Sequence, residues 1–194
     1  EDGDYNKYQI GEEFKSKLSD DFEPKEVGLI AYDDIKSIEE LIPKVIINDT
    51  DKEKKGRNIL INKEYDHIGI SQLVADEEIT IIIIFSKMKL KEKENVETIQ
   101  PSEVPAFSLS NEDSLIYEQI KEFRENPKKF LEKKEFVKPK KRKEYEEFLN
   151  SLEKMPELKP DKELCDLAKE EIKKFSEDGD YNKYQIGEEF KSKL

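Results

Sequence analysis

Hydrophobic residues recur at helical spacing through the C-terminal half of the chain and near residue 40. Apolar positions three and four residues apart predict amphipathic helices. The predicted buried stripes are Leu115, Ile116, Ile120 and Phe123; Tyr145, Phe148, Leu149 and Leu152 in a helix over 140–154; and Leu164, Leu167, Ala168, Ile172 and Phe175 in a helix over 161–175. A short helix is expected to begin at Pro127, with Asn126 as its N-cap. Another is expected over 35–47, bent or interrupted at Pro43.

Between residues 57 and 90 the apolar residues instead come in short runs. The phrases I-L-I around Ile59, H-I-G-I-S-Q-L-V from His67 and I-T-I-I-I-I-F-S-K-M from Ile79 predict three strands, with A-D-E-E as a hairpin turn between the last two. Four consecutive isoleucines at 81–84 predict a strand that is buried on both faces. We therefore expect an α+β fold: an α-β-α sandwich whose small, mainly antiparallel sheet of about three strands is covered by helices on both faces.

The first eighteen residues, EDGDYNKYQIGEEFKSKL, return letter for letter as residues 177–194. The spacing between the two starting points, residue 1 and residue 177, is then the period of a repeat, and the chain is a window slightly longer than one unit of a tandem array. An engineered circular permutant with a duplicated joint would give the same sequence. We call this duplicated segment the seam. A chain that starts inside a repeated phrase is expected to be cut from something longer.

Read as an array, the chain divides at Q-P-S-E-V-P-A-F-S-L-S-N-E, which has two prolines, three serines and no strong period. We assign residues 93–112 to a linker between units. Residues 1–92 are then the second half of one unit, with the seam at 1–18, and residues 113–194 are the first half of the next. The halves could complete each other within one chain or complete neighbouring units by domain swapping. One core formed by both halves of the same chain would count against swapping.

Composition and charge narrow the classes of function. The net charge of −12 argues against nucleic acid and anionic membrane surfaces as partners, because both attract basic proteins. No apolar run approaches the roughly 20 residues that cross a bilayer. The single cysteine, Cys165, allows no intrachain disulfide, and its setting E-L-C-D-L-A predicts a buried, unreactive thiol. Residues 20–53 carry eleven acids and four lysines, whereas 121–143 carry eleven Lys or Arg and four Glu, which predicts attraction between neighbouring units.

Several phrases carry a family resemblance once the halves are put in the order of the array. I-Y-E-Q-I-K-E-F-R-E-N-P, L-K-P-D-K-E-L-C-D-L-A and G-R-N-I-L-I-N-K-E-Y-D-H-I-G-I resemble phrases of the CAP superfamily (cysteine-rich secretory, antigen 5 and pathogenesis-related proteins), in its disulfide-free branch. The last phrase is the most specific, and Pro160 stands where the family has an aromatic residue. The seam falls where that branch has D-G and a short helix. The resemblance covers 113–194 and 19–85 and implies an α-β-α sandwich.

The resemblance also implies a metal cavity with two His and two Glu, and here this chain departs from the family. The positions matching the histidines are Lys55 and the pair Phe175 and Ser176. The stretch matching the first Glu has no acid until Asp33, and the second Glu falls in the isoleucine strand. His67, the only histidine, lies outside the tetrad position and is expected to be a hydrogen-bonded strand residue. We therefore assign no catalytic, cofactor-binding or metal-binding residue.

The seam also resembles a calcium-binding loop. From Asp178, oxygen-bearing side chains stand at loop positions one, three, five and twelve: Asp178, Asp180, Asn182 and Glu189. Position six, which requires glycine for its sharp turn, is Lys183, and position eight, usually apolar, is Gln185, with Ile186 one place late. EF-hands also pair, and apart from the identical copy in residues 1–18 the sequence has no second loop. The competing interpretation is a solvated acidic turn that opens a helix.

These observations favour a non-catalytic structural module of a long tandem-repeat protein, which assembles head to tail or by domain swapping into a fibre or filament. Its expected partners are neighbouring copies of the same unit. The alternatives are a secreted CAP module that binds a small apolar ligand, such as a sterol or fatty acid, and a calcium-responsive element at 178–189. We expect no enzyme activity, cofactor, nucleic-acid partner or transmembrane segment. The compartment stays open between the cell exterior or surface, as the family implies, and a cytoplasmic fibre.

Overall fold

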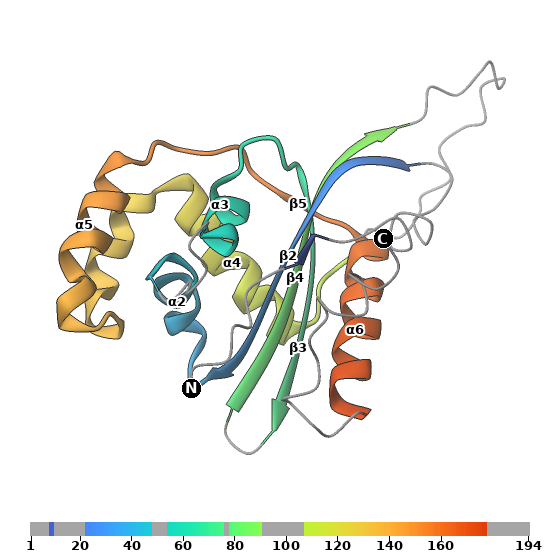
Figure 1. Cartoon of the computed structure of the whole chain (residues 1–194). Helices are drawn as coiled ribbons and strands as arrows, with labels where there is room; N and C mark the ends of the chain where they lie inside the picture. Colours follow the sequence, from blue (N-terminus) through green and yellow to red (C-terminus); the bar gives the residue numbers. More distant parts are fainter. Residues whose placement is uncertain (1–7, 10–21, 48–53, 76–77, 91–106, 178–194) are drawn as a thin grey trace, which may run out of the picture.

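A five-stranded sheet forms the centre of the molecule (Figure 1). The computed structural model describes residues 8–9, 22–47, 54–75, 78–90 and 107–177. The strand order is β1-β2-β4-β3-β5. The long strands are β2 (Phe22–Ile35), β3 (His67–Ala75) and β4 (Glu78–Leu90), and the two-residue strands are β1 (Tyr8–Gln9) and β5 (Lys159–Pro160). Every neighbouring pair is antiparallel except β3 with β5. The predicted hairpin of β3 with β4 is confirmed, and the sheet is mainly antiparallel as expected.

Strand β4 is the middle of the sheet and is buried on both faces. Its four isoleucines, 81–84, are each at most 1% exposed. Ile83 lies opposite Ile30 of β2 on one side and Ile70 of β3 on the other. Such a row of β-branched side chains packs well on a pleated surface. The prediction of a doubly buried strand is confirmed.

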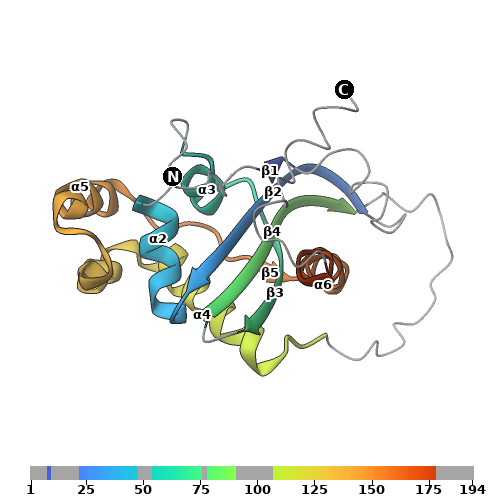
Figure 2. The ribbon, with the colours of Figure 1, turned by 60° about the horizontal axis from the view of Figure 1, so that its bottom comes forward.

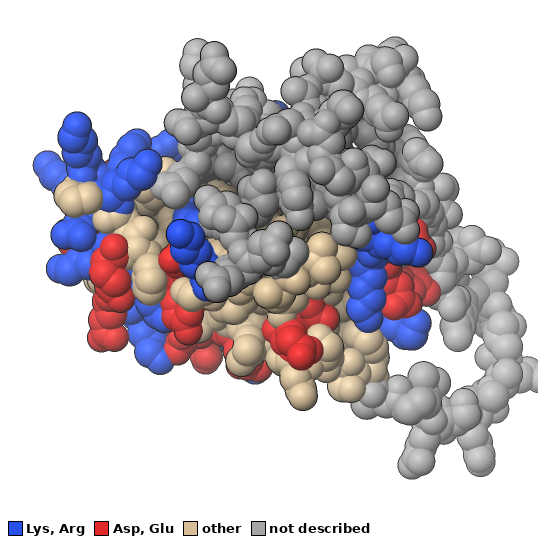
Figure 3. All heavy atoms as spheres, turned by 90° about the horizontal axis from the view of Figure 1, so that it is seen from below, with Lys and Arg blue, Asp and Glu red and all other residues tan. Residues whose placement is uncertain are grey.

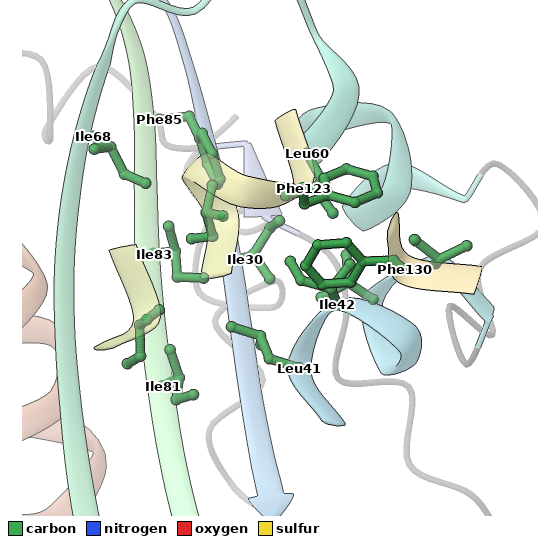
Figure 4. Packing of buried hydrophobic residues seen from close by; sticks show 14 of the residues in the cluster. Ile30, Leu41, Ile42, Leu60, Ile68, Ile81, Ile83, Phe85, Phe123 and Phe130 are labelled. Carbon is green, nitrogen blue, oxygen red and sulfur yellow. The ribbon is translucent and has the colours of Figure 1, made fainter. Parts of the chain in front are cut away.

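Helices cover both faces of this sheet, so the α+β fold and the α-β-α sandwich are confirmed (Figures 1 and 2). One face carries the 3₁₀ segments η1 (Ile38–Glu40), η2 (Pro127–Phe136) and η3 (Pro139–Lys141) and the helices α2 (Leu41–Ile47), α3 (Lys55–Ile61), α4 (Asn111–Glu125) and α5 (Arg142–Ser151). Among the described helices, α6 (Lys162–Glu177) packs alone on the other face. Each face has its own hydrophobic cluster, and the larger one lies under α2 to α5 (Figure 4).

The predicted stripes of α4 and α6 are largely correct. In α4, Ile116, Ile120 and Phe123 are fully buried, and the Ser110 hydroxyl caps the helix by accepting a hydrogen bond from the Asp113 amide at 3.1 Å. Leu115, predicted for the same stripe, is 61% exposed, because one residue turns the helix by about 100°. In α6, Leu164, Leu167, Ala168 and Ile172 are buried against Val27, Leu29, Ile82 and Ile84. The side chain of Phe175 lies outside the described residues.

The segment between α4 and α6 forms shorter elements than the sequence suggested. Pro127 begins η2 as predicted, but the side chain of Asn126 makes no capping hydrogen bond. Helix α5 is shorter than the predicted 140–154, since η3 precedes it and Leu152 ends it. Tyr145 and Leu149 are buried, whereas Phe148 and Leu152 are partly buried against the larger cluster.

Two assignments in the N-terminal half are wrong. The I-L-I run around Ile59 is not a strand but belongs to α3, where Gly56 and Leu60, one helical turn apart, are buried. The segment 35–47 is not one helix, because Ile35 ends β2 and the helical residues begin at Ile38 as η1 and continue as α2. Pro43 is the third residue of α2, and its missing amide hydrogen costs little in the first turn. The long strand β2 itself was not predicted.

Both halves of the chain contribute to one core. The larger cluster joins Ile30, Ile68 and Ile83 from the first half to Ile116, Phe123 and Tyr145 from the second. Because the two halves of the same chain form one core, this packing counts against domain swapping of the halves between chains. Helix α4 begins at Asn111, two residues inside the segment expected to be linker, and residues 93–106 lie outside the described part of the chain.

Candidate functional site

The first copy of the seam enters the sheet as β1, at the outer edge of β2. Tyr8 lies opposite Leu29 and Gln9 opposite Gly28, in antiparallel register. On its inner edge β2 pairs with β4 from Phe22 to Ile35. On its outer edge β1 covers two of the fourteen β2 residues, and the others have no strand partner there among the described residues. This edge is a place where another extended segment can add by main-chain hydrogen bonds.

The sequence of β2 hinders strand addition at its ends and not in its middle. Charged residues and Pro24 occupy 23–26, and two aspartates occupy 33–34, whereas the middle, V-G-L-I-A-Y, is uncharged. The pairing with β4 is irregular between Pro24 and Glu26 and again between Tyr32 and Ile35. Charges, proline and bulges all discourage pairing at a sheet edge. The uncharged middle, where β1 pairs, is therefore the part of the edge best suited to accept a strand.

The middle of β2 is also held firmly from behind by the helical layer. A Cβ atom at Gly28 would lie 2.7 Å from the Tyr65 hydroxyl and 2.8 Å from Cγ2 of Ile59. The glycine thus lets α3 and Tyr65 pack directly on the strand. Leu29, the next residue, is buried against the cluster under α6. Packing on both faces keeps β2 extended and its edge in place.

Arg124 is a buried charge that joins three parts of the larger helical layer. Its Nη1 donates to the carbonyl oxygens of Leu60 (2.9 Å) and Asn62 (3.0 Å), and its Nε donates to that of Pro156 (3.0 Å). Nη2 is buried and has no hydrogen-bond partner in the described structure. Burial lowers the pKa of Arg124 to about 10, which still leaves it charged at neutral pH. The guanidinium ties α4 to the end of α3 and to the segment after α5, so we assign it a structural role.

The residues that match the family's metal tetrad are not brought together. Lys55 begins α3 on the face of the larger cluster, whereas Phe175 and Ser176 belong to α6 on the opposite face. Asp33 lies in β2, and the side chains of these last three residues are not described. In the described ranges, no three or more His, Cys, Asp or Glu side chains are grouped so that they could hold a metal ion.

His67 is hydrogen-bonded as expected of a strand residue. It is the first residue of β3, and its Nδ1 lies 2.7 Å from Oδ1 of Asp66. Opposite it on β4 is Ser86, whose buried hydroxyl makes no hydrogen bond in the described structure. The side chain of His67 is therefore engaged by its neighbour in the chain.

Cys165 is buried, as predicted, between α6 and β3. Its Sγ accepts a hydrogen bond from the amide of Ile70 at 3.4 Å. Burial raises the pKa of the thiol from 9.0 to about 11. Because the thiolate is the reactive form, both the location and the pKa make this cysteine inert near neutral pH.

We expect this thiol to make the protein less stable as the pH rises from 9 to 11. Above pH 9 the unfolded chain loses the Cys165 proton while the folded chain keeps it, so the unfolded state binds fewer protons and gains stability. A shift of this size corresponds to roughly 2–3 kcal/mol in the free energy of unfolding. Urea unfolding of the wild type and of Cys165→Ala across this pH range measures it, because every other titrating group is common to both. Parallel pH curves for the two proteins would contradict the expectation.

The basic segment 121–143 is balanced in part within its own half of the chain, since five of its eleven Lys and Arg residues pair with glutamates of that half. Its ion pairs with glutamates of that half are Lys121–Glu157, Lys129–Glu122, Lys134–Glu146, Lys141–Glu144 and Lys143–Glu147. Figure 3 shows Lys and Arg side chains gathered at the end of the molecule where α5 lies, with acidic side chains among them. Exposed pairs of this kind add little to stability, and they leave less free charge for a neighbouring unit. Attraction between the oppositely charged segments of neighbouring units stays a prediction.

The remaining sequence predictions concern the seam and the membrane. The possible calcium loop at 178–189 lies outside the described residues. None of the described helices combines the length and apolar composition that crossing a bilayer requires.

No protein-family model, no curated protein and no solved structure gave a significant match to this chain.

Proposed function

We propose that this chain is a structural, non-catalytic, CAP-like module of a tandem-repeat protein. Because both halves of one chain share a core, we place the unit boundary at the seam instead of at residues 93–112, so that the seam joins each unit to the next. The observation that carries the proposal is the position of the two copies. The first copy supplies β1 at the sheet edge, and the second copy begins at Glu177, the last residue of α6. In an array, the segment that leaves α6 of one unit is thus the same segment that pairs with β2 of the following unit.

This arrangement sets how far apart neighbouring units can lie. In the second copy, Tyr184 and Gln185 correspond to Tyr8 and Gln9. Tyr184 follows Glu177 by seven residues, and a fully extended chain of that length spans about 25 Å. The sheet edge of one unit must then lie within about 25 Å of the end of α6 of the unit before it. Such a short connection favours a rod of closely stacked units over separate domains on long tethers.

The fold and the side-chain environments support the remaining parts of the proposal. The α-β-α sandwich is the fold that the resemblance to the CAP superfamily implies, and its most specific phrase spans α3 and the start of β3. The two side chains most suited to chemistry are otherwise engaged: Cys165 is buried, and His67 is bonded to Asp66. These features favour a structural role over catalysis.

The native size of the protein tests this proposal directly. An antibody against the seam peptide should detect, in the source cells, a protein far heavier than the 22.9 kDa of this chain. Partial proteolysis of that protein should give a ladder whose step equals the spacing between the two copies of the seam. The sequence of the gene around this window serves as the control, since it gives the number of copies independently. A native species no heavier than 22.9 kDa, from a gene with one copy, would refute the array.

A further inference from the structure

We propose that exposed apolar side chains at the β3–β4 hairpin end of the molecule form the surface against which the following unit of the array docks. We call this surface the hairpin-end patch, and it consists of Val74, Phe107 and Leu115. The proposal deepens the proposed function and rests on it, since it names a contact between successive units. The partner is a second copy of the same unit.

The exposure of these side chains is the first step of the argument. Among the described residues, they are the large hydrophobic side chains that are exposed: Val74 by 63%, Leu115 by 61% and Phe107 by 37%. A single exposed apolar residue is ordinary on a protein surface and needs no explanation. A group of them at one place is instead typical of an interaction site.

The location of the three residues at one end of the sandwich is the second step. Val74 lies opposite Ile79 in the hairpin, and Ile35, which pairs with Ile79 from the other side, leads into η1. Helix α4 packs against η1, whereas its last turn is bonded to the end of α3, at the opposite end of the sheet. Leu115 is the fifth residue of α4, and Phe107 precedes the N-cap by three residues. Figure 2 brings this end forward and shows the start of α4 beside the end of β3.

The charges around this end agree with an interface. Figure 3 views the molecule from the hairpin end and shows a largely uncharged area across the middle, with some acidic side chains in it. Lys and Arg side chains gather on either side of that area. An apolar centre with a polar and charged rim is the usual composition of a protein–protein interface.

The chain leaves for the next unit from the same end, which is the third step. Helix α6 follows β5 at the start of β3, and its Cys165 contacts Ile70 of β3. From Cys165 to Glu177 the helix rises about 18 Å, and β3 covers about 17 Å from Ile70 to Ala75. The end of α6 is therefore level with the hairpin (Figure 1).

This exit point brings the following unit to the patch. In the array, Glu177 is also the first residue of the next unit, whose β1 begins within about 25 Å of it. A domain of this length has a radius of gyration of about 16 Å, so 25 Å is less than its width. The surfaces around the two points therefore face each other, and the apolar side chains at the hairpin end are the part of this surface that gains most from contact.

A two-unit chain, made by joining residues 1–176 to residues 1–194, tests the proposal with an internal control. The patch of its first unit faces a neighbour, whereas the patch of its last unit faces none. One variant carries Val74→Thr with Leu115→Gln in the first unit, and the other carries the same changes in the last unit. The single chain with both substitutions gives their cost within a unit. Urea unfolding followed by circular dichroism measures all of them.

We expect the two-unit chain to unfold at a urea midpoint about 0.5 M above that of the single chain, because docking removes apolar side chains from water. After the cost within a unit is subtracted, substitution in the first unit should abolish this gain and substitution in the last unit should keep it. A polarity-sensitive fluorophore on Leu115→Cys should also emit at shorter wavelength in the first unit than in the last. Cys165 is buried and does not compete for the label.

Three results would overturn the proposal: equal midpoints of the one-unit and two-unit chains, equal effects of the substitutions in the two units, or equal emission from the two labelled positions. The fluorophore gives an answer even where the substitutions weaken the unit itself. None of these results bears on the number of copies in the gene or on the native mass. Failure of the docking surface is therefore distinguishable from failure of the tandem array.

Discussion

Replacing Arg124 with methionine is expected to lower the free energy of unfolding by about 2–4 kcal/mol. Methionine fills much of the volume of the arginine stem, but it leaves the carbonyl oxygens of Leu60, Asn62 and Pro156 without their donor. The loss of charge relieves some burial cost, since burial already lowers the pKa of the guanidinium to about 10. Leaving these carbonyl oxygens without a donor costs more free energy than the loss of the buried charge recovers. The reason is that the oxygen of Leu60 is buried, where solvent cannot replace the arginine.

Arg142 provides a matched control for this substitution. It is half-buried, and its Nε donates a single hydrogen bond, to the carbonyl of Val137 at 3.2 Å. Arg142→Met should therefore cost less than about 1 kcal/mol. Urea unfolding followed by far-UV circular dichroism gives both values from the midpoints at constant m. Similar losses for the two variants would mean that Arg124 adds no more than an ordinary surface arginine.

The substitution Arg124→Lys tests whether the positive charge alone, without the several N–H donors of the guanidinium, stabilises the fold. A lysine keeps the charge, but its single ammonium group cannot reproduce the two-nitrogen geometry that reaches α3 and Pro156 together. We expect this variant to lose nearly as much stability as Arg124→Met. Full recovery with lysine would show that charge alone, at the C-terminal end of α3, stabilises the layer.

The sequence predicted those parts of the fold in which the pattern of apolar residues is compatible with only one type of secondary structure. The isoleucines at 81–84 leave no polar face, and in a run this short that pattern fits a central strand. The apolar residues of α6 repeat at three and four positions over about three turns, and no strand could bury them together. In both cases the sequence determined which side chains are buried.

The errors come from short apolar runs, where helix and strand bury the same number of residues. The run I-L-I has only three apolar residues, which fits a strand or a helix equally well. In the structure it is helical, because the helix α3 places Leu60 in the core. β2 was missed because charged residues surround its apolar middle, and the segment reads as a loop without its partner strand. Its conformation depends on pairing with β4, whose partner residues lie 44 to 68 positions further along the chain, and no local pattern reports such a pairing.

The candidate edge was harder to predict than the fold. The acidic residues of the seam suggested a metal loop or a helix start, whereas the described part of the first copy is a strand. Tyr8 and Gln9 carry no pattern of their own, and β2 decides their conformation.

Gly69→Ala is expected to destabilise the protein by about 3 kcal/mol or more, the upper range for overpacking. A Cβ atom at this position of β3 would lie 2.2 Å from the main-chain carbon and 2.4 Å from the main-chain oxygen of Leu164. These atoms belong to the backbone of α6, so the whole helix must move away from the sheet to admit one methyl group. The neighbouring cysteine reports this motion, because the Cys165 thiol is bonded to Ile70 across the same contact.

Gly28→Ala is the matched control, with a close contact of a different kind. Its new Cβ would meet the Tyr65 hydroxyl at 2.7 Å and Cγ2 of Ile59 at 2.8 Å, which are side-chain atoms instead of the backbone atoms met at Gly69. We expect a loss of about 1 kcal/mol and no change in thiol labelling at this site. In Gly69→Ala, by contrast, Cys165 should react with a thiol reagent faster than the lowered global stability accounts for, because α6 separates from β3 locally. Equal losses in both variants, with Cys165 equally protected, would show that α6 adjusts as easily as a side chain and that its close approach at Gly69 does not hold the second layer of the sandwich in place.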